Sequence, residues 1–300
     1  MSSSVMGWMR VARKLQLHFR LISSTSYAKM PWDLIKRETV NRVEIIVVGR
    51  EILTGRTLDT NSNWLAKRIT TLGGDVKRVA VVDDKIDSIC GELRTALENN
   101  SHLIVTTGGL GPTFDDKTLD AVATAAGLKM ELDAEALDFV KGRYTFFKEQ
   151  GFVDTDELSP SRKKMAIFPN GAEMIPNPVG AAPGVKLWVG ETLVLSLPGV
   201  PKEMRAIFEE SLLKELRDLF GRRIFLEKTI TTTMGDESKL GEILDKVMTE
   251  VPRVYLKSRP TYFARDVRIE VTLTATGDDA DEVEARIQEA ISEIEKRLPR

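Results

Sequence analysis

Strand-like and helix-like stretches alternate along the chain from Val43 to Ala126. Short β-branched or apolar runs, typical of buried strands, lie at Val43–Val48, Val76–Val82 and His102–Thr106. Hydrophobic residues recur at helical spacing over residues 61–72 and 86–97, and a further helix is expected over 115–126. Strand and helix thus alternate three times. This order predicts an α/β fold, a three-layer sandwich with a mostly parallel sheet and helices on both faces.

The middle of the chain predicts fewer regular elements. A helix is expected over residues 139–150 and a polar loop over 151–162, followed by a stretch rich in Pro, Gly and Asn. Two strands, 185–189 and 192–197, flank Gly190-Glu191 as in a hairpin. Pro201 then begins a helix that runs to about Phe220, since proline is well tolerated at a helix start.

The pattern changes after Gly221. A strand over residues 224–233, a helix over 237–250, an alternating strand over 267–276 and a charged amphipathic helix over 280–298 predict a small α+β module. We therefore expect an α/β domain over residues 42–221 and a second domain over residues 222–300. Residues 1–41 form the third part of the chain.

Residues 1–41 are basic and rich in serine. Up to Val40 the acids are Asp33 and Glu38, and the bases are Arg10, Arg13, Lys14, Arg20, Lys29, Lys36 and Arg37. Such a start is typical of an organelle transit peptide, but also of a disordered extension or an upstream start codon with the true start near Met30. We favour the second interpretation and leave the stretch out of the fold.

Composition narrows the class of protein. The one cysteine, Cys90, excludes an internal disulfide and a zinc site made of several thiolates. No apolar run approaches the ~20 residues that span a bilayer. A net charge of −2 and an apolar content of 42% are typical of a globular protein without a membrane partner, and we predict a cytoplasmic location.

The strongest chemical feature is the segment Thr107-Gly-Gly-Leu-Gly-Pro-Thr113, which follows a predicted strand and precedes a predicted helix. Glycines allow close approach of backbone to a ligand, and free N–H groups at such a turn favour anions. Gly109-Leu-Gly111 does not complete a dinucleotide fingerprint, and Gly49 to Gly55, followed by Arg56, is only a near miss for a P-loop. The alternative is a simple helix cap, in which Thr113 and Asp116 form a capping box. Three glycines and a second aspartate favour a site for a phosphorylated small molecule.

Acidic residues follow each of the three predicted parallel strands. They are Glu51 after the first, Asp83 and Asp84 after the second, and Asp115 and Asp116 after the third. Parallel strands bring these ends to one edge of the sheet, where ligands bind in open α/β sheets. Carboxylates beside a phosphate suit a divalent ion such as Mg²⁺, Mn²⁺ or Co²⁺. The alternative is that each is a solvated or helix-capping acid, most plausibly so for Asp83.

Read together, these segments resemble the molybdopterin-binding-like (MoaB/Mog-type) domain of the competence/damage-inducible protein A (CinA) family. The resemblance covers residues 43–220 and rests on Gly49-x-Glu51, Gly55, Asp59-Thr-Asn61, Val82-Asp-Asp84, the glycine segment with Asp115, Asp116 and Thr118, Asn177 with Gly180, Ala182-Pro-Gly184 and Leu197-Pro-Gly-Val-Pro-Lys-Glu-Met204. It implies a KH-like module after Gly221 and a homodimer. We expect no C-terminal nicotinamide-nucleotide amidase domain, since the chain stops at Arg300.

The resemblance also implies an activity. Relatives with this domain act as metal-dependent ADP-ribose pyrophosphatases, and others bind or adenylylate molybdopterin, so both remain open here. Arg50 departs from the pattern, because the family usually has an acid between Gly49 and Glu51. If that acid holds metal, catalysis is in doubt. If it only orients the loop, Arg50 is free to meet a phosphate.

The resemblance and the strand-end pattern together assign the site residues. Asp84, Asp115 and Asp116 are the predicted catalytic acids, and Glu51, Asp115 and Asp116 are the predicted metal ligands. The phosphorylated substrate, or molybdopterin as ligand, is expected to contact Asp59, Asn61, Thr107, Gly108, Gly109, Gly111, Thr113, Pro183, Gly184, Pro198, Gly199 and Lys202.

Nucleic acid is the third class of partner considered. It is suggested by the KH-like tail and by Lys257, Arg259, Arg265 and Arg268. Against it, the tail has no GxxG loop, acids abound nearby and the chain is not basic. We therefore do not expect nucleic-acid binding.

Overall fold

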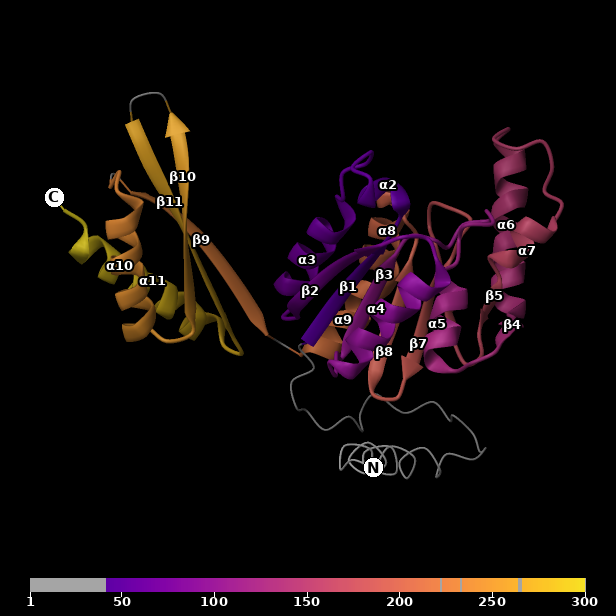
Figure 1. Ribbon diagram of the computed structural model, residues 1–300, viewed down its shortest axis with the longest axis horizontal. Coiled ribbons are helices and arrows are strands. Elements are labelled where there is room, and N and C mark those ends of the chain that lie inside the picture. Colours follow the sequence, from indigo (N-terminus) through magenta and orange to yellow (C-terminus); the bar gives the residue numbers. More distant parts are fainter. Residues whose placement is uncertain (1–41, 222, 233, 264–265, 300) are drawn as a thin grey trace, which may run out of the picture. The chain divides into compact units, whose positions relative to one another are not determined.

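The computed structural model describes residues 42–221, 223–232, 234–263 and 266–299. The interpretation of residues 1–41 as an extension lies outside these residues. The described chain contains a six-stranded sheet with its helices and, after Gly221, a three-stranded sheet with its own helices (Figure 1).

Six strands form the first sheet in the order β2-β1-β3-β8-β7-β6. The strands are β1 (Arg42–Val48), β2 (Asp75–Val82), β3 (Leu103–Thr107), β6 (Glu173–Ile175), β7 (Gly184–Val189) and β8 (Thr192–Leu197). The first four in the order are parallel, and β7 runs antiparallel to β8 as the predicted hairpin requires. The predicted mostly parallel sheet is confirmed.

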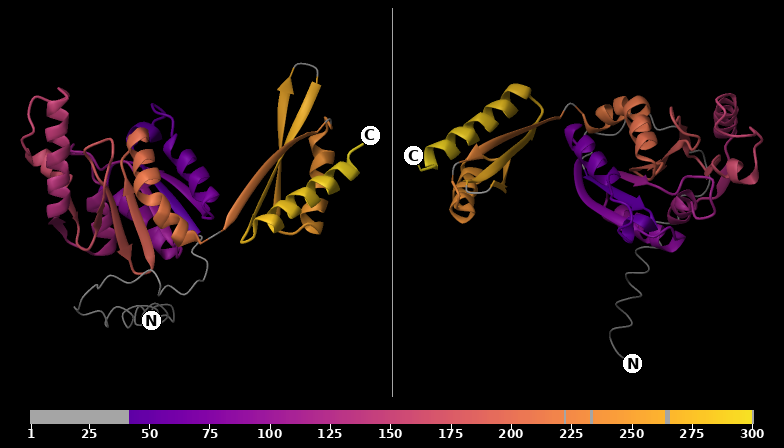
Figure 2. Two further views of the ribbon diagram at one scale, coloured as in Figure 1. Left: turned by 180° about the vertical axis from the view of Figure 1, so that it is seen from behind. Right: turned by 90° about the horizontal axis from the view of Figure 1, so that it is seen from above.

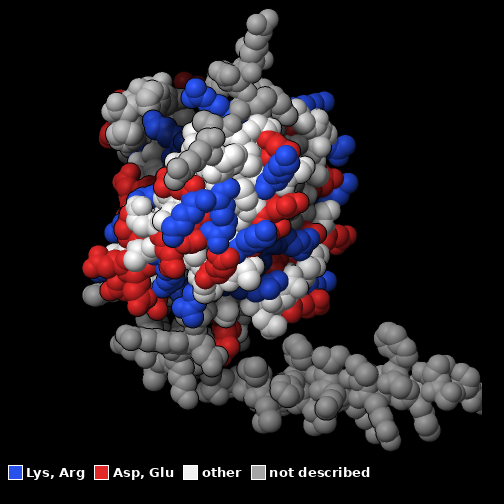
Figure 3. Space-filling model, turned by 90° about the vertical axis from the view of Figure 1, so that its left-hand side faces the viewer, with Lys and Arg blue, Asp and Glu red and all other residues white. Residues whose placement is uncertain are grey.

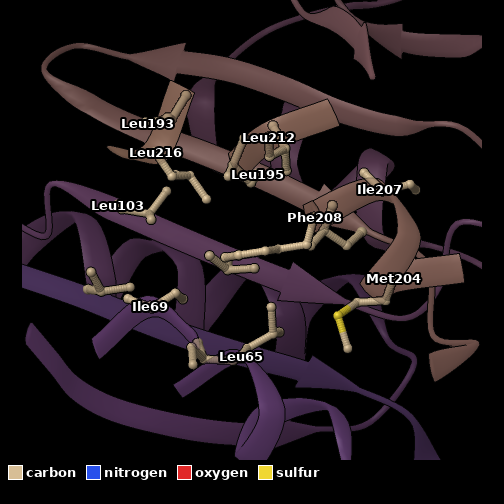
Figure 4. Close-up of a cluster of buried hydrophobic side chains, with 14 of the residues drawn as sticks. Leu65, Ile69, Leu103, Leu193, Leu195, Met204, Ile207, Phe208, Leu212 and Leu216 are labelled. Carbon is tan, nitrogen blue, oxygen red and sulfur yellow. The ribbon is translucent and has the colours of Figure 1, made fainter. Parts of the chain in front are cut away.

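Helices cover both faces of this sheet, which confirms the three layers (Figures 1 and 2). One face carries α3 (Asn61–Thr71) and a continuous helical stretch made of α8 (Pro201–Ala206), a π-helical turn (Ile207–Leu212) and α9 (Leu213–Phe220). Leu65 and Ile69 of α3 pack there with Phe208 and Leu216 (Figure 4). The other face carries α4 (Ile86–Glu98) and α5 (Thr118–Ala126), which bury Ile89, Leu93 and Ala121.

Several local predictions needed adjustment. Helix α5 begins at Thr118 and not near Asp115, because side-chain hydrogen bonds between Thr113 and Asp116 hold the preceding segment as a loop. The predicted polar loop 151–162 runs into the short helix α7 (Pro160–Lys164), which Ser159 caps. Short elements that lacked a clear pattern are α2 (Arg50–Leu53), β4 (Met130–Leu132) and β5 (Ile167–Pro169). Helix α6 (Ala134–Glu149) begins earlier than predicted, where Asp133 caps it.

The C-terminal module has a three-stranded antiparallel sheet in the order β10-β11-β9. Its elements are β9 (Ile224–Thr232), α10 (Glu237–Glu250), β10 (Val254–Phe263), β11 (Asp266–Gly277) and α11 (Ala280–Arg297). Both helices pack on the sheet, where Leu240, Leu244, Ile287 and Ile294 meet Leu256, Val271 and Leu273. The α+β module is thus confirmed, whereas its KH-like assignment stays a prediction.

Strand β10 was not predicted. It contains Pro260, which lacks the N–H that a central strand needs. Since β10 lies at the edge of its sheet, proline is tolerated there. Among the helices of the described residues, none has the length and apolar character to cross a membrane.

Candidate functional site at the carboxyl ends of the parallel strands

The register of the sheet places the ends of four parallel strands side by side. Val48 pairs with Val82, Val47 pairs with Thr107, and Thr107 pairs with Leu197. The segments that follow these residues therefore leave the sheet at one edge. They contain the predicted acids Glu51, Asp84, Asp115 and Asp116, the glycine segment, and Pro198 and Gly199.

Asn61 joins three of these segments. Its side chain is 8% exposed, and Nδ2 donates hydrogen bonds to Thr107 Oγ1 (3.1 Å) and to the Gly199 carbonyl oxygen (2.8 Å). Thr107 Oγ1 in turn donates to the Pro198 carbonyl oxygen (3.0 Å). The first turn of α3 thereby fixes the start of the glycine segment beside the end of β8. Of the predicted ligand contacts, Asn61 and Thr107 therefore have an evident positioning role.

The glycines of the segment are required by the protein's own packing. Gly108 has φ of 106°, and a Cβ there would lie 2.1 Å from the Val48 carbonyl oxygen. Gly109 has φ of 68°, and a Cβ there would lie 2.3 Å from Thr118 Oγ1. Both distances are far below van der Waals contact. The sequence predicts a ligand as the reason for these glycines, and the structure adds a reason that holds without one.

Some backbone N–H groups of this segment have protein acceptors and others do not. Gly108 N donates to the Leu197 carbonyl oxygen (3.0 Å) and Thr118 N to the Gly109 carbonyl oxygen (3.2 Å). Within the described part of the chain, the N–H groups of Gly109, Leu110 and Gly111 donate to no protein acceptor. Consecutive unpaired N–H groups in a glycine turn form a concave site for an anion. This arrangement is the geometric basis of the predicted phosphate site.

The acids of the loop build the loop itself. Asp116 Oδ2 accepts hydrogen bonds from Thr113 N (2.8 Å) and Thr113 Oγ1 (2.6 Å), and Thr113 Oγ1 also contacts Asp115. The hydrogen bond from Thr113, above all, lowers the pKa of Asp115. Asp116, the acid that seemed most clearly functional in the sequence, thus closes a turn with Thr113. Its predicted catalytic role stays a prediction.

Lys164 is a residue that the sequence did not single out. Its ammonium group donates hydrogen bonds to the carbonyl oxygens of Thr113 and Asp116 from helix α7. Burial lowers the pKa of this lysine, and the neighbouring charge of Asp116 opposes that effect. Because Lys164 follows the loop by about fifty residues and belongs to no motif, only the tertiary contact shows that it anchors the loop.

Asp84 has few partners at this edge. Its Oδ2 accepts a hydrogen bond from the backbone N–H of Arg50 (2.8 Å). Burial, and then the negative charges of Glu51 and Asp115, raise the pKa of Asp84. Adjacent Asp83 is paired with Lys85 (2.9 Å), which lowers the pKa of Asp83. The strand ends therefore bring Glu51, Asp84 and Asp115 within electrostatic reach of one another, as the sequence predicted.

The acids do not form a ready metal centre. In the ranges that the structure describes, no group of three or more His, Cys, Asp or Glu side chains is arranged to hold a metal ion. Asp116 is engaged with Thr113, and Asp115 contacts the same hydroxyl. The residues present therefore do not fit a resident ion held by protein ligands alone. The assignment of Glu51, Asp115 and Asp116 as metal ligands stays a prediction.

Three other predicted contacts have structural explanations. Asp59 Oδ1 accepts a hydrogen bond from Ser62 N (2.9 Å) and so caps helix α3. Pro183 and Gly184 are buried at the start of β7. A Cβ on Gly184 would lie 3.3 Å from the side chain of Ile175, so this glycine packs against the core. Lys202, by contrast, is exposed in the first turn of α8 and is free to reach a ligand.

A further buried arrangement organises the chain beside Pro183. Asn177 Nδ2 donates to Glu203 Oε2 (2.7 Å) and to the Ala182 carbonyl oxygen (2.8 Å), while Asn177 Oδ1 accepts from Gly180 N (2.8 Å). Burial raises the pKa of Glu203, and the hydrogen bond from Asn177 opposes that effect. The sequence had singled out Asn177 and Gly180 without a role. Their role is to shape the turn that leads into β7.

Charged side chains are mixed on the face of the molecule shown in Figure 3, where basic and acidic groups lie interspersed. Nucleic-acid binding relies on a surface of one sign. The expectation that nucleic acid is not a partner stays a prediction.

Comparisons with known proteins agree with this description. A family model described as a probable molybdopterin binding domain matches residues 44–218. A protein from Caldivirga maquilingensis is 41% identical over 258 residues, which cover 85% of this chain and 96% of the relative. The crystal structure of the CinA protein from Thermoplasma acidophilum, described as having unknown function, is 41% identical with a TM-score of 0.53. It covers 59% of this chain and 99% of its own.

Proposed function

The chain belongs to the family of this probable molybdopterin binding domain, and from that premise we propose that residues 44–218 bind a small molecule through its phosphate. The observation that carries the proposal is the row of unpaired N–H groups at Gly109, Leu110 and Gly111, at the carboxyl edge of a parallel sheet. Molybdopterin carries a phosphate monoester and ADP-ribose carries a pyrophosphate, so both present the required group.

Surrounding residues support a ligand at this edge. Lys202 is exposed at the start of α8, next to Gly199, whose carbonyl group is held by Asn61. Phe114 on the loop is 85% exposed and Val200 is 52% exposed, so the segments at this edge also carry apolar side chains open to solvent. A pterin or nucleotide offers a ring for that surface and a phosphate for the N–H groups.

Calorimetric titration with molybdopterin and, separately, with ADP-ribose tests the proposal. We expect a saturable heat for at least one of them and none for unphosphorylated ribose. Gly111→Ala is the matched site variant, because its Cβ would lie 2.7 Å from Asp116 Oδ2 and would force that carboxylate away from its hydrogen bonds with Thr113. Gly142→Ala, in helix α6 with open space around it, is the control that should bind normally. No heat from either ligand at high micromolar concentration would overturn the proposal.

A second candidate is hydrolysis of the ligand, as in a metal-dependent ADP-ribose pyrophosphatase. The observation in its favour is the position of Asp84, which lies near Glu51 and Asp115 and forms no ion pair with any residue that the structure describes. Water would cleave the phosphoanhydride bond of ADP-ribose to give AMP and ribose 5-phosphate. The requirement for Mg²⁺, Mn²⁺ or Co²⁺ is part of this second proposal, as is a homodimeric state.

Chromatography of the products tests the second candidate. Wild type is incubated with ADP-ribose and each divalent ion, beside Asp84→Asn and Asp116→Ala. AMP formed by wild type and lost in Asp84→Asn with binding retained would support hydrolysis. Binding of ADP-ribose without AMP under any of the three ions would leave the chain a binding protein.

A further inference from the structure

Arg50 is a cation placed among the acids of the site. It begins helix α2 directly after Gly49, and its backbone N–H donates to Asp84 Oδ2 (2.8 Å). Its backbone is thereby fixed next to the glycine loop, because Gly108 packs against the carbonyl oxygen of Val48. The Arg50 side chain itself is 70% exposed. A fixed backbone and an exposed guanidinium allow Arg50 to reach a ligand at this edge.

The contact that Arg50 makes with protein is weak and dispensable. Its Nη1 atom lies 3.8 Å from Asp83 Oδ2, at the outer limit of an ion pair. Asp83 already has a closer partner in Lys85, whose Nζ lies 2.9 Å from the same oxygen. Arg50 can therefore turn toward a ligand without leaving Asp83 unpaired. Exposed ion pairs of this kind contribute little to stability.

A phosphate at this edge needs a cation close by. Glu51, Asp84 and Asp115 are gathered at the same strand ends, and they repel an anion that approaches the unpaired N–H groups of the glycine loop. Either a divalent ion or a basic side chain can offset that repulsion. The acids of the described residues do not make a three-ligand metal group. Of the other cations near this edge, Lys164 is committed to the carbonyl oxygens of Thr113 and Asp116, whereas Lys202 is exposed in the first turn of α8, after Gly199.

We propose that the guanidinium of Arg50 binds the phosphate of the ligand, so that this site binds phosphorylated molecules without a divalent ion. The proposal rests on the phosphate-binding function proposed above. A guanidinium donates two parallel hydrogen bonds to phosphate oxygens, a geometry that an ammonium group does not reproduce. Arg50 thus supplies the charge, while the N–H groups of Gly109, Leu110 and Gly111 supply the concave surface.

The charge at position 50 then decides whether binding depends on a metal. In Arg50→Asp a fourth carboxylate joins Glu51, Asp84 and Asp115, and the phosphate loses its cation. A divalent ion would be attracted to those acids and could bridge them to phosphate oxygens. We therefore expect the Arg50→Asp variant to bind ligand only when such an ion is present.

Calorimetry with ADP-ribose and with inorganic pyrophosphate tests this, each in excess EDTA and in millimolar Mg²⁺. Wild type should bind with affinities that agree within about threefold between the two conditions. Arg50→Lys should bind several-fold more weakly in both, because it keeps the charge but loses the paired hydrogen bonds. Arg50→Asp should lose at least about tenfold in EDTA and recover in Mg²⁺.

Arg56→Asp is the matched control. Arg56 is exposed on the same segment and undergoes the same change of charge, so a general electrostatic effect would appear in both variants. We expect its affinity to change by less than about threefold. Circular dichroism and thermal unfolding of each variant confirm that the exposed substitutions leave the fold intact.

The outcomes separate the two proposals. Wild-type binding that requires Mg²⁺ would overturn the role of Arg50 and leave the phosphate-binding function standing. Arg50→Asp that binds in EDTA as tightly as wild type would overturn it as well. Absence of binding by wild type in both EDTA and Mg²⁺ would instead overturn the phosphate-binding function itself.

Discussion

The two ends of the parallel sheet hold carboxylates in opposite ways. At the amino end, Glu44 of β1 is 2% exposed and accepts hydrogen bonds from Asn99 Nδ2 (3.0 Å) and Ser101 Oγ (2.9 Å). Arg42 and Arg78 place guanidinium nitrogens 3.6 and 3.7 Å from its oxygens. This carboxylate is fully surrounded by partners.

At the carboxyl end, Asp84 has one hydrogen-bond donor from another residue, the backbone N–H of Arg50. It forms no ion pair with any residue that the structure describes, and the nearby charges of Glu51 and Asp115 are negative. A partly buried carboxylate without a cationic partner lowers the stability of the fold. Such groups are found at functional sites, where another role explains them. The contrast shows a buried, fully partnered carboxylate at the amino end, and at the carboxyl end, where we propose that a ligand binds, a carboxylate with a single donor from another residue.

The largest expected effect is a loss of stability when the buried carboxylate at the amino end is removed. In Glu44→Ala, the guanidinium groups of Arg42 and Arg78 lose a buried partner, so unfolding in urea should become easier by about 3 kcal/mol. Glu98→Ala, an exposed acid at the end of α4, is the control and should change stability by less than about 0.5 kcal/mol. Equal effects of the two changes would show that Glu44 is not the stabilising acid described here.

The next effect concerns the loop at the carboxyl end. Gly108→Ala forces a Cβ against the Val48 carbonyl oxygen and a side chain into positive φ, which should cost about 2–3 kcal/mol. Gly142→Ala, inside helix α6 with open space around it, should instead stabilise by about 0.5–1 kcal/mol. Thermal unfolding of both variants measures the difference. A neutral Gly108→Ala would contradict the close contact between loop and strand.

A smaller effect is expected from the anchor of the same loop. Lys164→Met removes the hydrogen bonds to the carbonyl oxygens of Thr113 and Asp116 and should destabilise by about 1 kcal/mol. Hydrogen exchange at residues 113–117 should become faster. Lys163→Met, an exposed neighbour in α7, should leave that exchange unchanged. Unchanged exchange in Lys164→Met would show that the loop holds its shape without this lysine.

The smallest expected effect is a gain in stability, when the carboxylate of Asp84 at the carboxyl end is removed. The pKa of Asp84 is raised on folding, so its ionised form weakens the fold above the ordinary carboxyl range. Asp84→Asn should therefore stabilise at pH 7, by up to about 1 kcal/mol after allowance for solvent screening. The gain should disappear as the pH falls below about 4, where the wild-type group is protonated in both states. Urea unfolding at several pH values measures it, and a loss of stability at pH 7 would contradict the contrast with Glu44.

Much of the fold could be predicted because the local pattern of apolar residues agrees with their burial in the folded structure. Val43–Val48 is almost wholly buried in a parallel sheet, as its β-branched residues, interrupted only by Glu44, predict. Strand β10 could not be predicted, since Pro260 and the charged residues Lys257 and Arg259 interrupt the apolar pattern by which a strand is predicted. The start of α5 was misplaced because Thr113 and Asp116 form a turn of their own, which the sequence alone does not distinguish from a capping box.

Some features of the candidate site could likewise be predicted from the sequence, and others could not. The glycine segment and the acids after each strand could be found from sequence, because parallel strands bring consecutive strand ends to one edge. Which of these acids lacks side-chain partners could not be predicted from the sequence. Asp116 is engaged by Thr113, whereas Asp84 is short of partners, and this follows from side-chain geometry alone. Lys164, Asn177 and Glu203 act across long stretches of chain that no local motif connects.

The sequence by itself thus determined the alternation of strands and helices, the parallel order that follows from it and the edge of the sheet at which the glycine segment and the acids meet. These follow from residue periodicity and from chain connectivity, both of which are local. Tertiary structure decided which glycines the packing requires, which carboxylates have partners and where the guanidinium of Arg50 lies. Those properties depend on distances between residues far apart in the chain, and only the folded structure sets such distances.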